Sequence, residues 1–112
     1  MVHISRDAII PEDKLTRYLL APRPRNDKSK YLARAGFTLL NWQALLEELQ
    51  RLTREVEVVE DITHEYGTFY LVEGRIKGPN GLEPDLITVW LKSAEDNRFR
   101  FITLKPGRRD VA

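Results

Sequence analysis

Apolar residues recur at helical intervals in the first half of the chain. Between residues 42 and 52 they fall at i, i+3, i+4, i+7 and i+10, namely at Trp42, Leu45, Leu46, Leu49 and Leu52. This spacing places all five on one face of an α-helix, and charged residues occupy the opposite face. We therefore predict an amphipathic helix that starts at Asn41, whose side chain suits the N-cap position.

Two shorter helices are predicted before it. Pro11 fits the first position of a helix, and a second apolar stripe follows at Leu15, Tyr18 and Leu19. A short helix then runs from Lys28 towards Gly36, with Asp27 as its N-cap and the glycine as its stop. The β-branched run at 8–10 fits a short edge strand.

After residue 54 apolar and polar residues alternate, which is typical of β-strands. Four strands are predicted, over residues 55–60, 68–77, 83–92 and 98–105. Helices followed by strands predict an α+β fold, with two to three N-terminal helices packed on one face of a four-stranded, mostly antiparallel sheet.

The turn at 78–81, Gly-Pro-Asn-Gly, decides which side chains share a face of this sheet. If Asn80 and Gly81 are its central pair, Glu73 lies opposite Thr88. An apolar face then packs on the helices, formed by Tyr70, Val72, Gly74, Ile76, Ile87, Val89 and Leu91. The open face is formed by Phe69, Leu71, Glu73, Arg75, Thr88 and Trp90. The fourth strand can present Phe99, Phe101 and Thr103 to either face.

Length and composition fit a single globular domain. The chain has 112 residues, 42% of them hydrophobic and 31% charged, so we expect one core over 1–112 with flexible ends at 1–7 and 106–112. Cysteine is absent, which excludes disulfides and thiolate metal sites and favours a cytoplasmic location. No apolar run approaches the roughly 18 residues of a membrane span, so no membrane association is expected.

The net charge of +1 hides an uneven distribution. Residues 14–34 hold seven basic residues and one acidic, whereas residues 43–65 hold seven acidic and two basic. Such an asymmetry steers polyanions, although a solubilising surface with clustered charges explains it too. Lys28 and Lys30 occupy the first turn of a predicted helix, where the dipole prefers negative charge, so the helix start is a candidate phosphate site.

The available chemistry is limited. His3 and His64 lack neighbours at metal-ligand spacing, and no nucleophile triad, phosphate-binding glycine loop or dinucleotide motif occurs, so we expect no metal and no cofactor. Metal-free cleavage of RNA needs only a base, an acid and cations on the phosphate. We predict the catalytic residues Lys28, Glu73, Arg75 and Thr88 and the binding residues Lys30, Tyr31, Trp90 and Thr103.

Those residues also have simpler interpretations. Glu73 and Arg75 are two apart on one strand face and fit solvated partners as well as a base and a phosphate ligand. Trp90 fits a core aromatic residue as well as a base-stacking platform.

Several short motifs together resemble an uncharacterised family of small bacterial proteins. They are Lys14-Leu15-Thr16-Arg17-Tyr18-Leu19-Leu20, Asp27-Lys28-Ser29-Lys30-Tyr31-Leu32 with Gly36-Phe37, Gly78-Pro79-Asn80-Gly81, Thr88-Val89-Trp90 and Phe101-Ile102-Thr103. The resemblance spans about Ile10 to Lys105. Before the lysine that matches Lys28, the family has His-Pro or Gly where this chain has residues 23–26, Arg-Pro-Arg-Asn.

The resemblance implies a toxin–antitoxin-like pair. Members of the family often occur beside a gene for another very small protein, and similar domains occur at the ends of secreted toxins. The element order also resembles the barnase, colicin and RelE class of ribonucleases. Two hypotheses follow. The first is a toxin-like RNA-binding or metal-free ribonuclease domain, controlled by a small partner encoded nearby. The second is a non-enzymatic module that docks a protein on the open aromatic face of the sheet.

Overall fold

The computed structural model describes residues 3–24 and 28–107. One antiparallel sheet has the order β1-β2-β3-β4, formed by β1 (Val59–His64), β2 (Gly67–Arg75), β3 (Asp85–Ser93) and β4 (Phe99–Pro106). The helical elements are the π-helix η1 (Lys14–Leu19), the helix α1 (Ser29–Ala33), the 3-10 turn η2 (Leu39–Asn41) and the helix α2 (Trp42–Glu55). The predicted α+β fold is confirmed.

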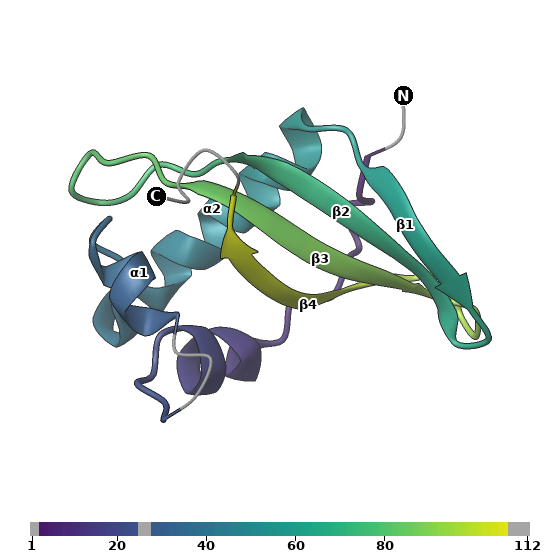
Figure 1. Cartoon of the computed structure of the whole chain (residues 1–112), viewed down its shortest axis with the longest axis horizontal. Helices are drawn as coiled ribbons and strands as arrows, with labels where there is room; N and C mark the ends of the chain where they lie inside the picture. Colours follow the sequence, from purple (N-terminus) through teal and green to yellow (C-terminus); the bar gives the residue numbers. More distant parts are fainter. Residues whose placement is uncertain (1–2, 25–27, 108–112) are drawn as a thin grey trace.

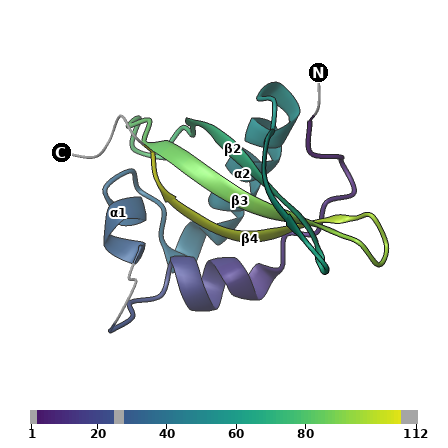
Figure 2. The same ribbon diagram turned by 45° about the vertical axis from the view of Figure 1, so that its right-hand side comes forward.

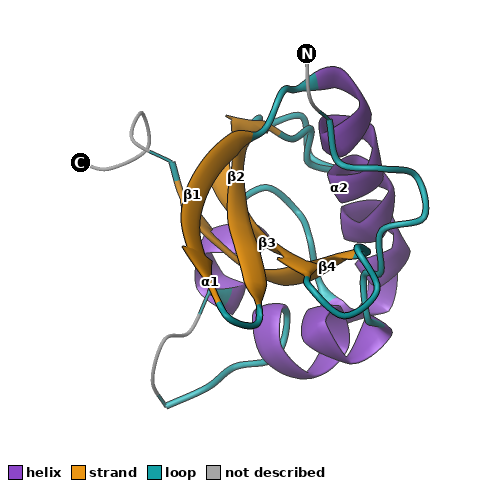
Figure 3. Cartoon of the chain, turned by 90° about the vertical axis from the view of Figure 1, so that its right-hand side faces the viewer, coloured by secondary structure: helices purple, strands orange, loops and turns teal. Residues whose placement is uncertain are grey.

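The helices and the sheet form two layers. α2 crosses one face of the curved sheet, which Figure 1 and Figure 3 show from two directions. η1 lies along the β4 edge, and α1 lies near the end of β4 (Figure 2). We call the face that contacts α2 the inner face and the opposite one the outer face. None of the described helices covers the outer face.

The core lies between α2 and the inner face. Leu45, Leu49 and Leu52 of α2 are buried, as the helical periodicity predicts. They meet buried residues of the strands, which include Val72, Ile76, Leu86, Trp90, Phe101 and Leu104. α2 approaches β2 closely at Gly74, where a Cβ would lie 2.7 Å from Leu52 Cδ1 and would require that side chain to shift.

The predicted pairing of β2 with β3 is wrong by one residue. Val72, and not Glu73, lies opposite Thr88, and Arg75 lies opposite Asp85. A shift of one residue moves every side chain of a strand to the other face. Thr88 and Trp90 therefore lie on the inner face, and Ile87, Val89 and Leu91 lie on the outer face; the assignments for β2 are unaffected.

The turn chemistry explains the shift. Gly81 N donates to Gly78 O at 3.0 Å, so the central turn residues are Pro79 and Asn80. Proline is favoured at the first central position of such a turn because its ring fixes φ near −65°. Gly81 follows with φ of +92° and adds one residue to the hairpin loop.

Other boundaries also differ from the predictions. α2 continues to Glu55, so the first strand begins at Val59 and not at residue 55. The run at 8–10 forms a single parallel bridge between Ile9 and Arg100 instead of a strand. Asn41 precedes α2 without capping it; its Nδ2 donates to Gly36 O, and its Oδ1 accepts from Thr38 N.

The packed part of the chain extends beyond the expected ends. Ile4 is buried, and Gly107 N donates to Asp85 O at 2.7 Å, although 1–7 and 106–112 are expected to be flexible. Phe99 and Phe101 point into the core, and a register irregularity in the pairing of β4 with β3 then places Thr103 opposite Val89 on the outer face. The predicted cap Asp27 lies outside the described residues, as does 108–112. Among the helices of the described chain, none has the length and apolarity to cross a membrane.

A candidate phosphate-binding cleft beside strand β4

A cleft of about 290 Å³ opens between η1, the segment that follows it, and β4. It is lined by Lys14, Tyr18, Leu19, Arg23, Lys28, Ile102 and Thr103. Three of these residues are cations and none is a carboxylate. Within residues 3–24 and 28–107, no carboxylate forms an ion pair with any of the three. The cleft therefore carries an excess of positive charge.

η1 positions two of the lining residues. Its wide turns are visible in the bond from Leu20 N to Leu15 O, which spans five residues at 2.9 Å. π-helical turns are uncommon and often occur at functional sites. Lys14 Nζ lies 5.7 Å from the centre of the Tyr18 ring, and Arg23 Cζ lies 4.2 Å from it. The ring thus holds two cations at the cleft through cation–π contacts.

Lys28 enters the cleft from the N-terminal end of α1 and reaches β4. Its Nζ donates to Thr103 Oγ1 at 2.9 Å, and both residues are half-buried. Burial lowers the pKa of the Lys28 ammonium, and the nearby charges of Lys105 and Arg23 lower it further. An ammonium that has lost water and faces like charges gains from the arrival of an anion.

The geometry suits a phosphate group. Lys28 and Thr103 present hydrogen-bond donors, and the arginine and lysine beside the Tyr18 ring supply further charge. α1 has only five residues, so these side chains, more than a helix dipole, make the site. Among the described residues that line the cleft there is no carboxylate and no imidazole. In the described part of the chain, no three potential ligand side chains gather as a metal site needs.

The structure brings part of the predicted site together. Thr103 lies on the outer face, where it is paired with Val89, and Lys28 contacts it directly. Glu73 and Arg75 project from the same face of β2 and are exposed. Since neighbouring strands lie about 4.8 Å apart, β2 is roughly 10 Å from β4.

Thr88 and Trp90 do not belong to this surface. Both are fully buried on the inner face. Trp90 Nε1 donates to Thr88 Oγ1 at 2.9 Å, and that hydroxyl donates to Val72 O at 2.9 Å. The Trp90 ring also packs edge-on against Phe101, with ring centres 5.3 Å apart. The placement of Thr88 and Trp90 on the open face was thus wrong, because it followed from the incorrect register.

The remaining predicted residues lie on α1. Lys30 is exposed and does not line the cleft. Tyr31 is half-buried, and its hydroxyl donates to Asp85 O at 2.9 Å, which joins α1 to the start of β3. Tyr31 lines a separate surface depression with Arg34 and Leu82.

A family model for a domain of unknown function, DUF6883, matches residues 3–108. The chain belongs to the DUF6883 family. This match covers the η1, α1 and β4 segments that build the cleft, and it confirms membership of an uncharacterised family.

The fold of this DUF6883 domain occurs in a solved structure, a contact-dependent growth inhibition toxin–immunity protein complex from Klebsiella pneumoniae 342. The TM-score is 0.70 at 20% sequence identity, with 91% of this chain and 95% of the other chain covered. At that identity the match establishes a shared fold. None of the curated proteins compared with the chain matches it.

Sequence reasoning missed four residues of the cleft region: Lys14, Tyr18, Arg23 and Lys105. For Lys14 and Arg23 the sequence signal was the basic run at 14–34. For Tyr18 it was the i, i+4 spacing from Lys14, which places both residues on one helical face. The sequence does not show that this helical face lies beside β4.

Proposed function

We propose that this DUF6883 protein is a toxin-like domain that binds RNA at the basic cleft and cleaves it without a metal ion. The observation that carries the proposal is the pair Lys28 and Thr103, 75 positions apart in sequence and hydrogen-bonded in a cleft with two further cations. Cations without carboxylate partners are suited to neutralise a phosphodiester, and RNA supplies its own nucleophile in the 2′-hydroxyl.

In this proposal Lys28 donates to a non-bridging phosphate oxygen, and Thr103 orients its ammonium. Arg23 and Lys14 bind the adjacent phosphate. Glu73 is the candidate base: it projects from the outer face on which Thr103 lies, and a nucleotide that extends from β4 over β3 would reach it. Buried Thr88 and Trp90 support the sheet beneath the site, since no substrate can contact them.

A small protein partner is part of the proposal. The chain with the same fold is found in a complex of a toxin with its immunity protein. Of the two roles, the cleft favours the toxin, because clustered cations are suited to bind a nucleic acid. The partner, encoded nearby, would then cover the cleft with acidic side chains and so block access of RNA.

The outer face of the sheet favours a second candidate, a protein-docking module without catalytic activity. Five apolar side chains of β2 and β3 stay half-exposed there: Phe69, Leu71, Ile87, Val89 and Leu91. Contiguous apolar patches of this kind are typical of protein interfaces. The face is less aromatic than expected, because the corrected register removes Trp90 from it.

The deciding experiment is RNA cleavage by the purified protein in excess EDTA, with Lys28→Ala and the control Lys77→Ala. Lys77 is exposed and lies outside the cleft. We expect cleavage by the wild type and Lys77→Ala, and a large loss for Lys28→Ala. RNA that stays intact and unbound at low salt with all three proteins would refute the nuclease and favour docking.

A further inference from the structure

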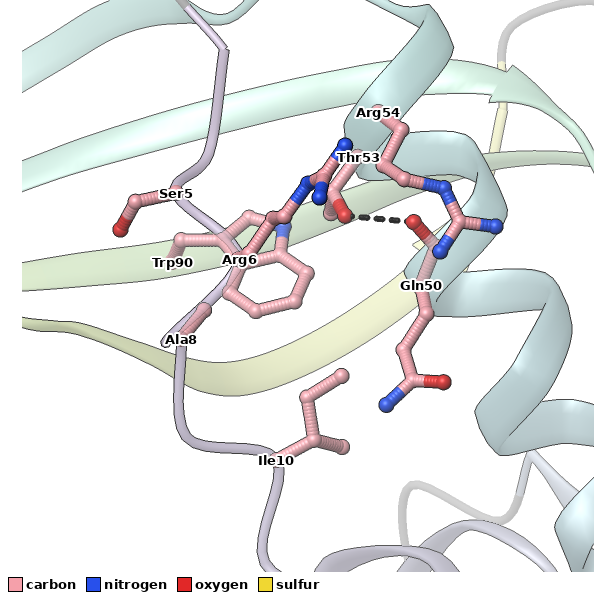
Figure 4. A pocket seen from close by; sticks show the side chains of 8 residues that line it. All are labelled: Ser5, Arg6, Ala8, Ile10, Gln50, Thr53, Arg54 and Trp90. Carbon is pink, nitrogen blue, oxygen red and sulfur yellow. Dashed lines mark hydrogen bonds between the residues drawn. The ribbon is translucent and has the colours of Figure 1, made fainter.

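A second cavity lies on the helical side of the molecule, between the N-terminal segment and α2. It measures about 360 Å³, within the range of small-molecule pockets. Ser5, Arg6, Ala8, Ile10, Gln50, Thr53, Arg54 and Trp90 line it. Figure 4 shows these side chains, which come from the N-terminal segment, from α2 and from β3.

The cavity combines an apolar base with a cationic opening. Ala8 and Ile10, both half-buried, supply the apolar wall, and Trp90 borders the cavity although its side chain is fully buried. Arg6 and Arg54 project from two different elements on either side of Thr53 in Figure 4. Two guanidinium groups beside one cavity complement the charge of a phosphate monoester, which carries close to two negative charges at neutral pH.

Neither guanidinium is neutralised within the described residues. No ion pair links Arg6 or Arg54 to a carboxylate there. The acidic neighbour in sequence, Asp7, is occupied: it accepts from Ser5 Oγ at 2.6 Å and pairs with Arg98 at 3.7 Å. Arginines that pair with no carboxylate among residues 3–24 and 28–107, and that border a cavity, are suited to bind an anionic ligand.

Polar groups are also present for the rest of a ligand. Thr53 is buried, and its Oγ1 donates to Gln50 O at 2.8 Å, which leaves the hydroxyl able to accept. The Gln50 side chain is exposed and offers both a donor and an acceptor. A ligand with a phosphate, polar edges and a flat apolar ring would use every part of the lining.

We propose that this cavity binds a nucleoside monophosphate or a phosphate ester of similar size, at a site separate from the basic cleft. Arg6 and Arg54 hold the phosphate, Gln50 and Thr53 bind polar edges, and the apolar wall accommodates the ring. The proposal does not depend on RNA cleavage at the cleft.

The test is titration of the full chain with 5′-AMP and, separately, with inorganic phosphate, followed by nitrogen–proton NMR. The indole N–H of Trp90 reports on the cavity, and that of Trp42, at the far end of α2, serves as an internal reference. We expect 5′-AMP to shift the Trp90 signal, and Arg6→Gln and Arg54→Gln each to weaken binding about tenfold or more. Arg17→Gln is the matched control, since that side chain is 79% exposed on η1 and lies outside the cavity.

Three results would overturn the proposal. The first is a Trp90 signal that stays in place up to about 10 mM 5′-AMP, far above any useful affinity. The second is binding that Lys28→Ala removes and Arg54→Gln leaves intact, because the nucleotide then sits in the cleft. The third is equal affinity for inorganic phosphate, which would mean that the apolar wall contributes nothing. The four variants, Arg6→Gln, Arg54→Gln, Arg17→Gln and Lys28→Ala, change exposed or half-buried charged side chains, so each is expected to fold.

Discussion

Arg51 and Lys28 are both half-buried cations, but their surroundings differ. Arg51 pairs with Glu48 at 3.0 Å and with Glu55 at 2.7 Å, and its guanidinium also donates to Arg75 O at 3.0 Å. Lys28 contacts a neutral hydroxyl and faces other cations. The group of Glu48, Arg51 and Glu55, here called the clamp, satisfies its own charges, whereas the cleft does not.

The clamp has an evident structural task. It joins the outer surface of α2 to the end of β2, and Glu48 also accepts from the backbone N–H of Lys77. A cation that is fully partnered in this way contributes to the free energy of folding. The cations of the cleft repel one another, so they cost stability and are expected to be compensated when an anion binds. The charges of the clamp therefore stabilise the fold, whereas the charges of the cleft are suited to bind a ligand.

The largest expected effect is that of Lys28→Met, which keeps the length of the side chain and removes its charge. We expect RNA cleavage to fall by about 10²–10³-fold, as for loss of a donor that stabilises charge in the transition state. The free energy of unfolding should stay within about 0.5 kcal/mol of the wild type or increase. Initial cleavage rates and urea unfolding of the same preparation measure both quantities. A variant that unfolds easily would mean that Lys28 serves the fold.

Arg51→Met tests the opposite region. Removing the guanidinium leaves Glu48 without its main partner, so the free energy of unfolding should fall by about 1–2 kcal/mol. Part of the clamp is exposed, which keeps the effect below that of a buried pair. RNA cleavage at a temperature where both proteins are folded should not change. An equal loss of activity in the folded variant would contradict the separation of the two regions.

Thr103→Val tests the orientation of Lys28. Valine has nearly the same shape, so the substitution removes the hydrogen bond from Lys28 at 2.9 Å and the longer one from the Thr103 hydroxyl to Leu104 O at 3.4 Å. Loss of one such bond corresponds to about 0.5–1.5 kcal/mol, which predicts a twofold to tenfold loss of cleavage. Thr63→Val, on an exposed threonine of β1, is the control. A loss as large as that of Lys28→Met would indicate a direct role of the hydroxyl in the reaction.

Much of the fold can be predicted from the sequence, because α2 has a clear helical periodicity and turn residues bound the apolar runs of β2, β3 and β4. The register of β3 cannot be derived from periodicity alone, since both of its faces are largely apolar. It depends on whether Pro79 or Asn80 comes first in the turn, and the preference of proline for that position was given too little weight. One turn residue thus decided whether Thr88 and Trp90 belong to the core or to the surface.

The candidate site shows a similar limit. Lys28 was singled out because a positive charge at a helix start is unusual, and its contact with Thr103 joins two of the predicted residues. Lys14 and Tyr18 were missed because an apolar stripe does not show which strand η1 meets, and Arg23 was missed because it lies in the segment after that helix. Contacts between distant elements are set by packing, which a local pattern does not contain.

The smallest expected effects are those of pH on stability: in both regions stability rises with pH, in an acid window for Glu48 and in an alkaline window for Lys28. Burial raises the pKa of the Glu48 carboxyl, but the hydrogen bonds from Arg51 and from Lys77 N–H outweigh it and leave that pKa below its ordinary value. As the pH falls, the Glu48 carboxyl therefore binds its proton at a higher pH in the unfolded chain than in the folded one. The stabilisation is complete above the unfolded pKa of about 4.3 and is lost as the pH falls through the folded pKa.

Lys28 acts at alkaline pH, and there it is the charged form that disfavours folding. Its pKa is lowered in the folded protein, so folding is disfavoured while the ammonium is charged. Stability from this group should increase as the pH rises from the folded pKa towards the unfolded value of about 10.4, because the unfolded chain binds more protons in that window.

Urea unfolding at a series of pH values, for wild type, Arg51→Met and Lys28→Met, resolves the two contributions. Arg51→Met should reduce the acid dependence alone, and Lys28→Met the alkaline dependence alone. If either variant altered both limbs of the profile, the clamp and the cleft would be coupled, and the assignment of separate roles to them would fail.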